Sequence, residues 1–78
     1  MILSYYYTGI HKEDLGKLEK KAQSLKADYK SFVVGPIERN MHIRFTGDNL
    51  KDCEKKASKF RKDYANKKEI GPWSRDVR

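Results

Sequence analysis

The sequence predicts an α+β domain in which two β-α-β units follow one another. Three observations predict it: an internal repeat, two apolar stripes with helical spacing, and two strands with alternating apolar residues. The chain has 78 residues, which is enough for one hydrophobic core but not for two. We therefore treat residues 1–78 as one domain, with repeat halves at approximately 1–38 and 39–78.

The internal repeat appears when the sequence is shifted by 35 positions. Seven of the sixteen positions from Asp14 to Tyr29 then match their counterparts, where chance would give roughly one or two. The identities are Leu15 with Leu50, Glu-Lys-Lys-Ala at 19–22 and 54–57, and Asp28-Tyr29 with Asp63-Tyr64. Two flanking matches keep the same order, namely Tyr7-Thr8-Gly9 with Phe45-Thr46-Gly47, and the Gly-Pro segments that begin at Gly35 and Gly71. Each half therefore predicts a strand, a Thr-Gly turn, a helix and an extended Gly-Pro segment.

Both predicted helices carry apolar residues at three- and four-residue steps. The stripes are Leu15, Leu18, Ala22, Leu25 and Tyr29 in the first half, and Leu50, Cys53, Ala57, Phe60 and Tyr64 in the second. This spacing puts each set on one helix face, so we expect both stripes to be buried. Asp48 or Asn49 is the expected N-cap of the second helix, and the acidic Glu13 and Asp14 favour the positive end of the first.

The central strands are predicted from alternation. Leu3, Tyr5 and Tyr7 share one face of the first strand, and Met41, Ile43 and Phe45 share one face of the third. Right-handed crossovers then place both helices on one face of a four-stranded antiparallel sheet. The first and third strands are central, and the Gly-Pro segments form the edges, where proline is tolerated. This β-α-β-β-α-β order resembles the ferredoxin-like split β-α-β sandwich, a fold that does not determine function.

Charge differs strongly between the halves. The net charge is +7 and the pI is near 9.6. Residues 1–38 hold six lysines against five acids, whereas residues 39–78 hold twelve lysines and arginines against six acids. A basic excess attracts polyanions such as nucleic acid, although a basic composition without a specific partner is the other interpretation.

The excess is concentrated on the second helix, in a lysine stripe opposite the apolar one: Lys51, Lys55, Lys59 and Lys62. Its counterparts on the first helix are Gly16, Lys20, Ser24 and Ala27, so the fold does not require it. The stripe matches a phosphate backbone, or is a solvated helix face. The small residues Gly16, Ser24 and Ala27 would let another helix approach closely. We expect them to form a homodimer surface, unless they are neutral surface variation.

The sheet face away from the helices is predicted to show Ser4, Tyr6, His42 and Arg44. Such aromatic, imidazole and guanidinium groups stack on and pair with the bases of single-stranded RNA. The topology resembles that of the RNA recognition motif. The basic-Gly-aromatic-Gly-aromatic string of that family is absent from the third strand, however. The alternative is a face that is solvated or covered by a second copy.

The sequence does not predict an enzyme. Cys53 falls in a buried stripe, no glycine-rich phosphate loop is present, and His11 and His42 lie in different elements. One cysteine and two histidines, without Cys-x-x-Cys or His-x₃-His spacing, predict neither a metal site nor a cofactor.

The same composition predicts a location. No apolar run reaches the ~18–20 residues that span a bilayer. The apolar start, Met1 to Tyr5, lacks the basic leader of a secretory signal. A single cysteine suits a reducing compartment, so we expect a cytoplasmic protein without membrane contact.

Two functional hypotheses follow. The first is a small non-enzymatic protein that binds RNA, or another nucleic acid, with the lysine stripe together with Tyr6, His42 and Arg44. The second is a small inhibitor or regulatory factor, of the kind that viruses encode. It would bind a host protein or a protein–RNA complex through the uncovered sheet face or an edge strand. The salt dependence of binding distinguishes the two hypotheses, because the affinity for a polyanion falls steeply with salt and that of an apolar interface does not.

Overall fold

The computed structural model describes the backbone of residues 1–65 and 72–78 and the side chains of residues 1–62 and 74–78. Six elements follow one another: β1 (Ile2–His11), α1 (Lys12–Ser24), β2 (Asp28–Val33), β3 (Glu38–Thr46), α2 (Leu50–Ala65) and β4 (Pro72–Val77). The strands pair antiparallel in one sheet of order β2-β3-β1-β4. The predicted α+β architecture is confirmed, with β1 and β3 at the centre of the sheet.

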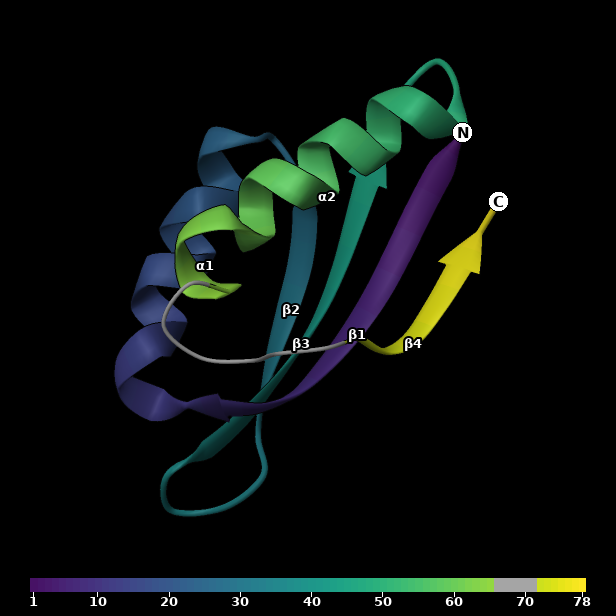
Figure 1. Ribbon diagram of the computed structural model, residues 1–78. Coiled ribbons are helices and arrows are strands. Elements are labelled where there is room, and N and C mark those ends of the chain that lie inside the picture. Colours follow the sequence, from purple (N-terminus) through teal and green to yellow (C-terminus); the bar gives the residue numbers. More distant parts are fainter. Residues whose placement is uncertain (66–71) are drawn as a thin grey trace.

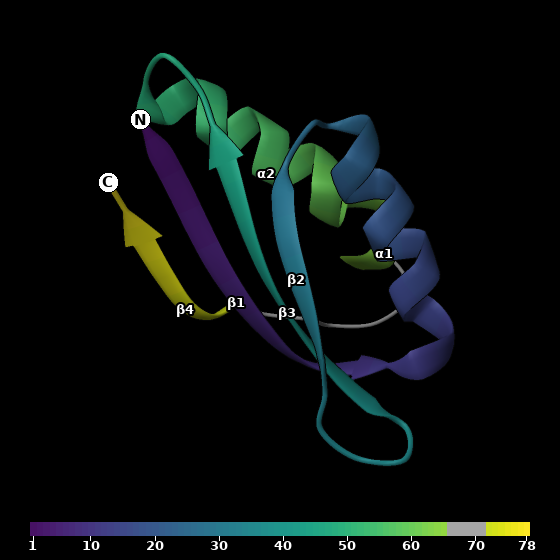
Figure 2. The same ribbon diagram turned by 180° about the vertical axis from the view of Figure 1, so that it is seen from behind.

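Both helices lie on the same face of the sheet (Figure 1). The view from behind shows the strands in front of the helices, so that the other face carries no described helix (Figure 2). Neither described helix is long and apolar enough to cross a membrane.

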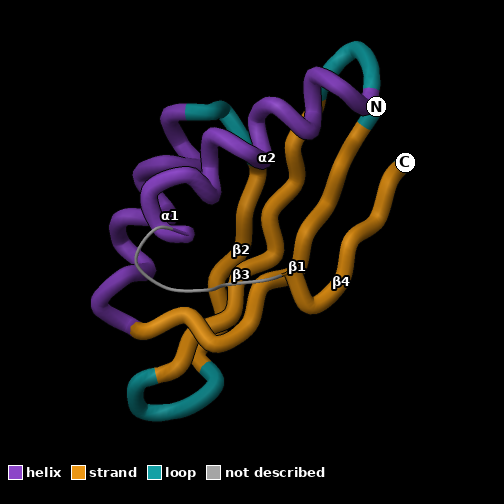
Figure 3. Tube along the Cα trace, viewed as in Figure 1, coloured by secondary structure: helices purple, strands orange, loops and turns teal. Residues whose placement is uncertain are grey.

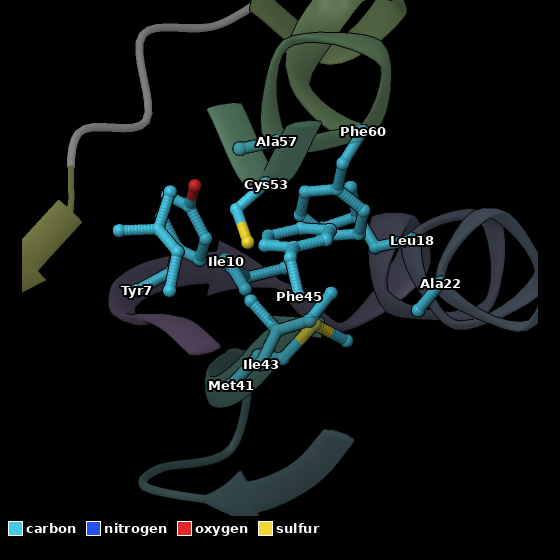
Figure 4. Packing of buried hydrophobic residues seen from close by; sticks show 11 residues of the cluster. Tyr7, Ile10, Leu18, Ala22, Met41, Ile43, Phe45, Cys53, Ala57 and Phe60 are labelled. Carbon is cyan, nitrogen blue, oxygen red and sulfur yellow. The ribbon is translucent and has the colours of Figure 1, made fainter. Parts of the chain in front are cut away.

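The core lies between this helix layer and the sheet (Figure 4). Its buried members include Tyr7, Met41, Ile43 and Phe45 from the central strands, Leu18 and Ala22 from α1, and Cys53, Ala57 and Phe60 from α2. The rings of Phe45 and Phe60 meet edge to face, with their centroids 5.8 Å apart. Both predicted apolar stripes are therefore buried against the predicted strand face, except at their ends. The side chain of Tyr64 lies outside the described residues.

The first helix ends earlier than the repeat predicts. His11 is its N-cap, because its Nδ1 accepts a hydrogen bond from the backbone N–H of Glu13 at 3.2 Å. Lys26 adopts a left-handed φ of 55°, which a helix interior cannot contain. Tyr29 consequently lies in β2, and its assignment to the helical stripe is wrong. Of the two N-caps predicted for α2, Asp48 and Asn49, the cap is Asn49, since its Oδ1 accepts a hydrogen bond from the N–H of Asp52 at 3.0 Å.

The two Thr-Gly pairs have different structures. Thr8-Gly9 is not a turn but a bulge inside β1, where the register with β3 shifts between Tyr7 and Ile10 and Gly9 has a φ of 73°. Gly47 does follow the end of β3, in the connection to α2. An added Cβ there would lie 2.9 Å from the Cβ of Asp52, so only glycine fits without a shift.

The first Gly-Pro segment is not an edge strand, contrary to the prediction. Gly35 and Pro36 lie in the loop of the β2–β3 hairpin. The N–H groups of Val34 and Gly35 both donate to the carbonyl of Glu38, and Arg39 Nη1 donates to the Gly35 carbonyl at 2.9 Å. These bonds close the hairpin, so the edge strand is the preceding segment, β2. At the opposite edge, β4 does begin at a proline, Pro72, as predicted, while Gly71 lies outside the described residues.

Candidate nucleic-acid interface

The uncovered sheet face, which we call the open face, brings together residues from all four strands. Tyr6 on β1 pairs with His42 on β3, and their ring centroids lie 6.3 Å apart. Lys30 on β2 lies opposite His42, and Ser74 on β4 lies opposite Tyr6. One row of residues therefore crosses the whole sheet: Lys30, His42, Tyr6 and Ser74. Tyr6 and His42 lie on the face that the alternation predicts.

Two further open-face residues, Phe32 and Lys30, were not predicted from the sequence. Phe32 is 43% exposed, and its ring centroid lies 6.2 Å from that of Tyr6. The Asn40 side chain, opposite Phe32, donates from Nδ2 to the Tyr6 hydroxyl at 3.2 Å and so holds the Tyr6 ring in place. The alternating run Asp28 to Val33 was the available signal. The repeat assigned its first residues to the helix and so concealed it.

A second row, formed by Asp28, Arg44, Ser4 and Asp76, carries charges of both signs, and Arg78 lies next to it. Arg44 Nη2 lies 3.3 Å from Asp28 Oδ2, and Arg78 Nε lies 2.8 Å from Asp76 Oδ2. All four side chains are exposed by half or more, so each ion pair contributes little to stability. A phosphate can therefore replace the carboxylate partner at small cost.

Two hollows flank Arg44 and His42 on the open face. One has a volume of about 510 Å³ and is lined by Asp28, Tyr29, Lys30, His42 and Arg44. The other, of about 320 Å³, is lined by Ile2, Ser4, Tyr5, His42, Arg44, Ser74, Asp76 and Arg78. Ser4 is only 8% exposed, so it forms part of the floor of that hollow and does not project from the face. Cationic groups and hydroxyls thus meet in concave surroundings.

The lysine stripe lies on the other side of the molecule. All four of its lysines are exposed on α2, opposite the buried Cys53, Ala57 and Phe60. Since α2 packs on the helix-bearing face, the sheet stands between the stripe and the open face (Figure 3). The structure therefore does not bring the stripe together with Tyr6, His42 and Arg44, as the single binding surface of the first hypothesis requires.

The small-residue surface of α1 is shorter than expected. Gly16 and Ser24 are exposed on α1, and an added Cβ at Gly16 would meet no atom within 4 Å. Ala27 lies beyond the end of the helix, partly buried against the core, so its placement beside Gly16 and Ser24 was wrong. Homodimer formation through Gly16 and Ser24 stays a prediction.

The two histidines are not brought together. His11 lies five residues beyond Tyr6 along β1, which puts it roughly 16 Å from His42 at ~3.3 Å per residue. Cys53 is fully buried, and its Sγ lies 3.5 Å from the Met1 carbonyl. In the described part of the chain, no group of three or more His, Cys, Asp or Glu side chains is placed to hold a metal ion.

Comparison of the chain with protein-family models, with curated proteins and with solved structures finds no match. Function is therefore inferred from the geometry of the chain itself. That geometry offers a ring cluster with flanking cations on the open face, and a separate lysine stripe on α2.

Proposed function

We propose that this protein is a non-enzymatic binding protein for single-stranded RNA, and that it holds the bases on its open face. The observation that carries the proposal is the contiguous ring cluster of Phe32, Tyr6 and His42, with Lys30 and Arg44 beside it. Aromatic side chains on a sheet stack on unpaired bases, at about 1–3 kcal/mol per base, and neighbouring cations bind the phosphates.

The lysine stripe has a second role in this proposal. Four exposed lysines on one helix face match phosphates without reading bases, so they add affinity that does not depend on sequence. The sheet separates them from the bases on the open face. We therefore assign base stacking to the open face and purely electrostatic contacts to α2.

We also propose that the fold is ferredoxin-like and arose by duplication of a β-α-β unit. The strand order β2-β3-β1-β4 and the two helices on one face support the fold assignment. Repeat-matched residues with matching environments support the duplication, since Ala22 and Ala57 are 0% and 4% exposed. The single cysteine, which is buried and reduced, suits a cytoplasmic location.

A specific observation favours a second candidate, the inhibitor or regulatory factor that binds a protein. The β2–β3 hairpin exposes four large apolar side chains: Phe32, Val33, Val34 and Ile37. Val33 is 77% exposed, and β2 is an edge strand whose outer hydrogen-bonding groups face away from the sheet. Exposed apolar surface of this kind occurs at protein interfaces.

The test is the affinity for a labelled RNA of about six nucleotides, a length within the range that one small domain covers. Tyr6→Ala and Phe32→Ala should each weaken binding by about 1–3 kcal/mol, since each removes a stacking ring. Val33→Ala is the matched control, because Val33 is an exposed apolar residue on the same strand with its side chain on the opposite face. Wild-type protein that binds no RNA even at low salt would reject the RNA proposal in favour of the protein-binding candidate.

A further inference from the structure

A groove of about 640 Å³ lies between α2 and the β1 side of the sheet, on the helix-bearing side of the molecule. We call it the α2 groove. It is lined by Tyr5, Glu54, Ala57, Ser58, Lys59, Arg61 and Lys62. The groove therefore includes two lysines of the stripe, Lys59 and Lys62, and does not include the other two.

Arg75 joins the groove to the edge of the sheet. It pairs with Tyr5 across β1 and β4, and its guanidinium carbon lies 6.0 Å from the centroid of the Tyr5 ring. Its Nη2 lies 3.7 Å from Glu54 Oε1 on α2. One cation of the edge strand therefore reaches from β4 to the helix that forms the groove wall.

The charge of the groove favours an anion. Among its described lining residues, Lys59, Arg61 and Lys62 are cationic, and Glu54 is the one acid. Glu54 is engaged by Arg75, and both side chains are about half exposed, so the pair can exchange with a phosphate at small cost. Ser58 adds a hydroxyl that can donate a hydrogen bond to a phosphate oxygen.

Cations also occur on the far side of β4. Arg78, which directly follows β4, lines the smaller hollow of the open face together with Arg44 and Ser74. The α2 groove and the open face are thus separated at this edge by a single strand, with Arg75 on one side and Arg78 on the other.

We propose that the α2 groove binds backbone phosphates of the same RNA strand whose bases lie on the open face, after that strand has crossed the edge of β4. This inference rests on the RNA-binding function proposed above. The smallest extent of the Cα trace is 19 Å. An RNA strand that passes from the open face to the α2 groove over this distance needs about six nucleotides at roughly 3.4 Å each. Short RNA therefore occupies the open face alone, and only longer RNA reaches the groove.

The experiment compares two double variants that remove the same charge from the same helix. Lys59→Gln with Lys62→Gln changes the groove, whereas Lys51→Gln with Lys55→Gln changes the part of the stripe outside it. Affinity is measured for RNA of about six and about sixteen nucleotides, together with thermal melts. All four lysines are exposed, so both variants should melt near wild type.

The groove variant should bind the short RNA like wild type and lose most of the extra affinity of the long RNA. Its log-log salt slope for the long RNA should fall by about 1.4 units, for two lost phosphate contacts at about 0.7 each. Arg75→Gln should also reduce the gain in affinity from short to long RNA, because Arg75 lies where the RNA would cross the edge of β4. The control variant should lose clearly less of that gain, because Lys51 and Lys55 lie outside the groove.

Equal losses in the two double variants would overturn the inference, because general charge would then explain the effect. A loss on short RNA as large as on long RNA would also overturn it, since the groove would bind without any crossing. In either case the proposed function survives if Tyr6→Ala still lowers the affinity for the short RNA. Wild-type protein that binds neither RNA rejects the function and the groove together.

Discussion

Tyr6 on β1 and His42 on β3 lie directly opposite each other on the open face, with ring centroids 6.3 Å apart. The sheet pairing alone joins them, because they are 36 residues apart in the chain. The same sheet separates both rings from the lysine stripe on α2. The two surfaces can therefore be altered independently, and they should affect binding in different ways.

The whole lysine stripe should contribute to binding and hardly to stability. With Lys51, Lys55, Lys59 and Lys62 changed together to Gln, we expect a melt near wild type, because exposed lysines add little to folding. The log-log salt slope for RNA of about sixteen nucleotides should become shallower by up to about three units. Tyr6→Ala should weaken binding by about 1–3 kcal/mol and leave that slope unchanged. A salt titration of the three proteins checks this, and equal binding by wild type and the quadruple variant would show that the stripe is only solvated.

The paired alanines of the two helices should be equally intolerant of charge. Ala22→Asp and Ala57→Asp each place a carboxylate in the core, which should cost roughly 3 kcal/mol or more. Lys20→Asp and Lys55→Asp are matched controls at exposed, repeat-equivalent positions and should cost less than about 1 kcal/mol. Thermal melts measure all four, and a stable Ala22→Asp or Ala57→Asp variant would contradict the assigned core.

Two glycines should respond to alanine with opposite signs. Gly47→Ala places a Cβ 2.9 Å from the Cβ of Asp52 and 3.2 Å from the Cys53 nitrogen, so we expect a loss of about 1–3 kcal/mol. Gly16→Ala enters open space within α1 and should stabilise the protein by about 0.5–1 kcal/mol. Urea unfolding of both variants gives the two values. A stabilising Gly47→Ala would show that the β3–α2 connection is looser than described.

The buried hydroxyl of Tyr7 should make the protein sensitive to alkali. It has no hydrogen-bond partner among the described residues, and burial raises its pKa, an effect that the charge of Arg61 partly offsets. The folded state holds the Tyr7 proton more tightly than the unfolded state does. The free energy of unfolding is therefore unaffected by this group below the unfolded pKa of about 10, and it falls as pH rises beyond that value.

Tyr7→Phe should therefore reduce the loss of stability between about pH 9 and about pH 11, relative to wild type. At neutral pH it should be neutral or stabilising by up to about 1 kcal/mol, since it removes an unpaired buried hydroxyl. Tyr29→Phe should instead destabilise at neutral pH, because the Tyr29 hydroxyl accepts a hydrogen bond from Gln23 Nε2 at 2.8 Å. Denaturant midpoints at neutral pH, at about pH 9 and at about pH 11 test both variants. If Tyr7→Phe lost as much stability at alkaline pH as wild type, Tyr7 would not be the responsible group.

The repeat was informative about the helices and misleading about one edge of the sheet. Leu18 and Cys53, like Ala22 and Ala57, are matched by the repeat and are all buried. The match of Asp28-Tyr29 with Asp63-Tyr64 has no structural meaning, because the first pair lies in β2 and α2 extends to Ala65. Matching residues indicate a common local pattern, but the left-handed Lys26 ended the first helix before that pattern did.

Local patterns in the sequence predicted most of both apolar stripes, the alternation in β1 and β3, and the lysine stripe opposite the apolar face of α2. They offered Asp48 or Asn49 as the cap of α2 without choosing between them. Strand and helix patterns have periods of two and 3.6 residues, and a cap depends on a residue three positions away. All of these can be predicted from a short stretch of sequence. Strand pairing was needed to show that β2 adds Phe32 to the ring cluster and Lys30 beside it. The packing of α2 was needed to show that the lysine stripe and the open face lie on opposite sides of the sheet. Both depend on which strands pair and which face the helices cover, and the contacts that decide this join residues far apart in the chain.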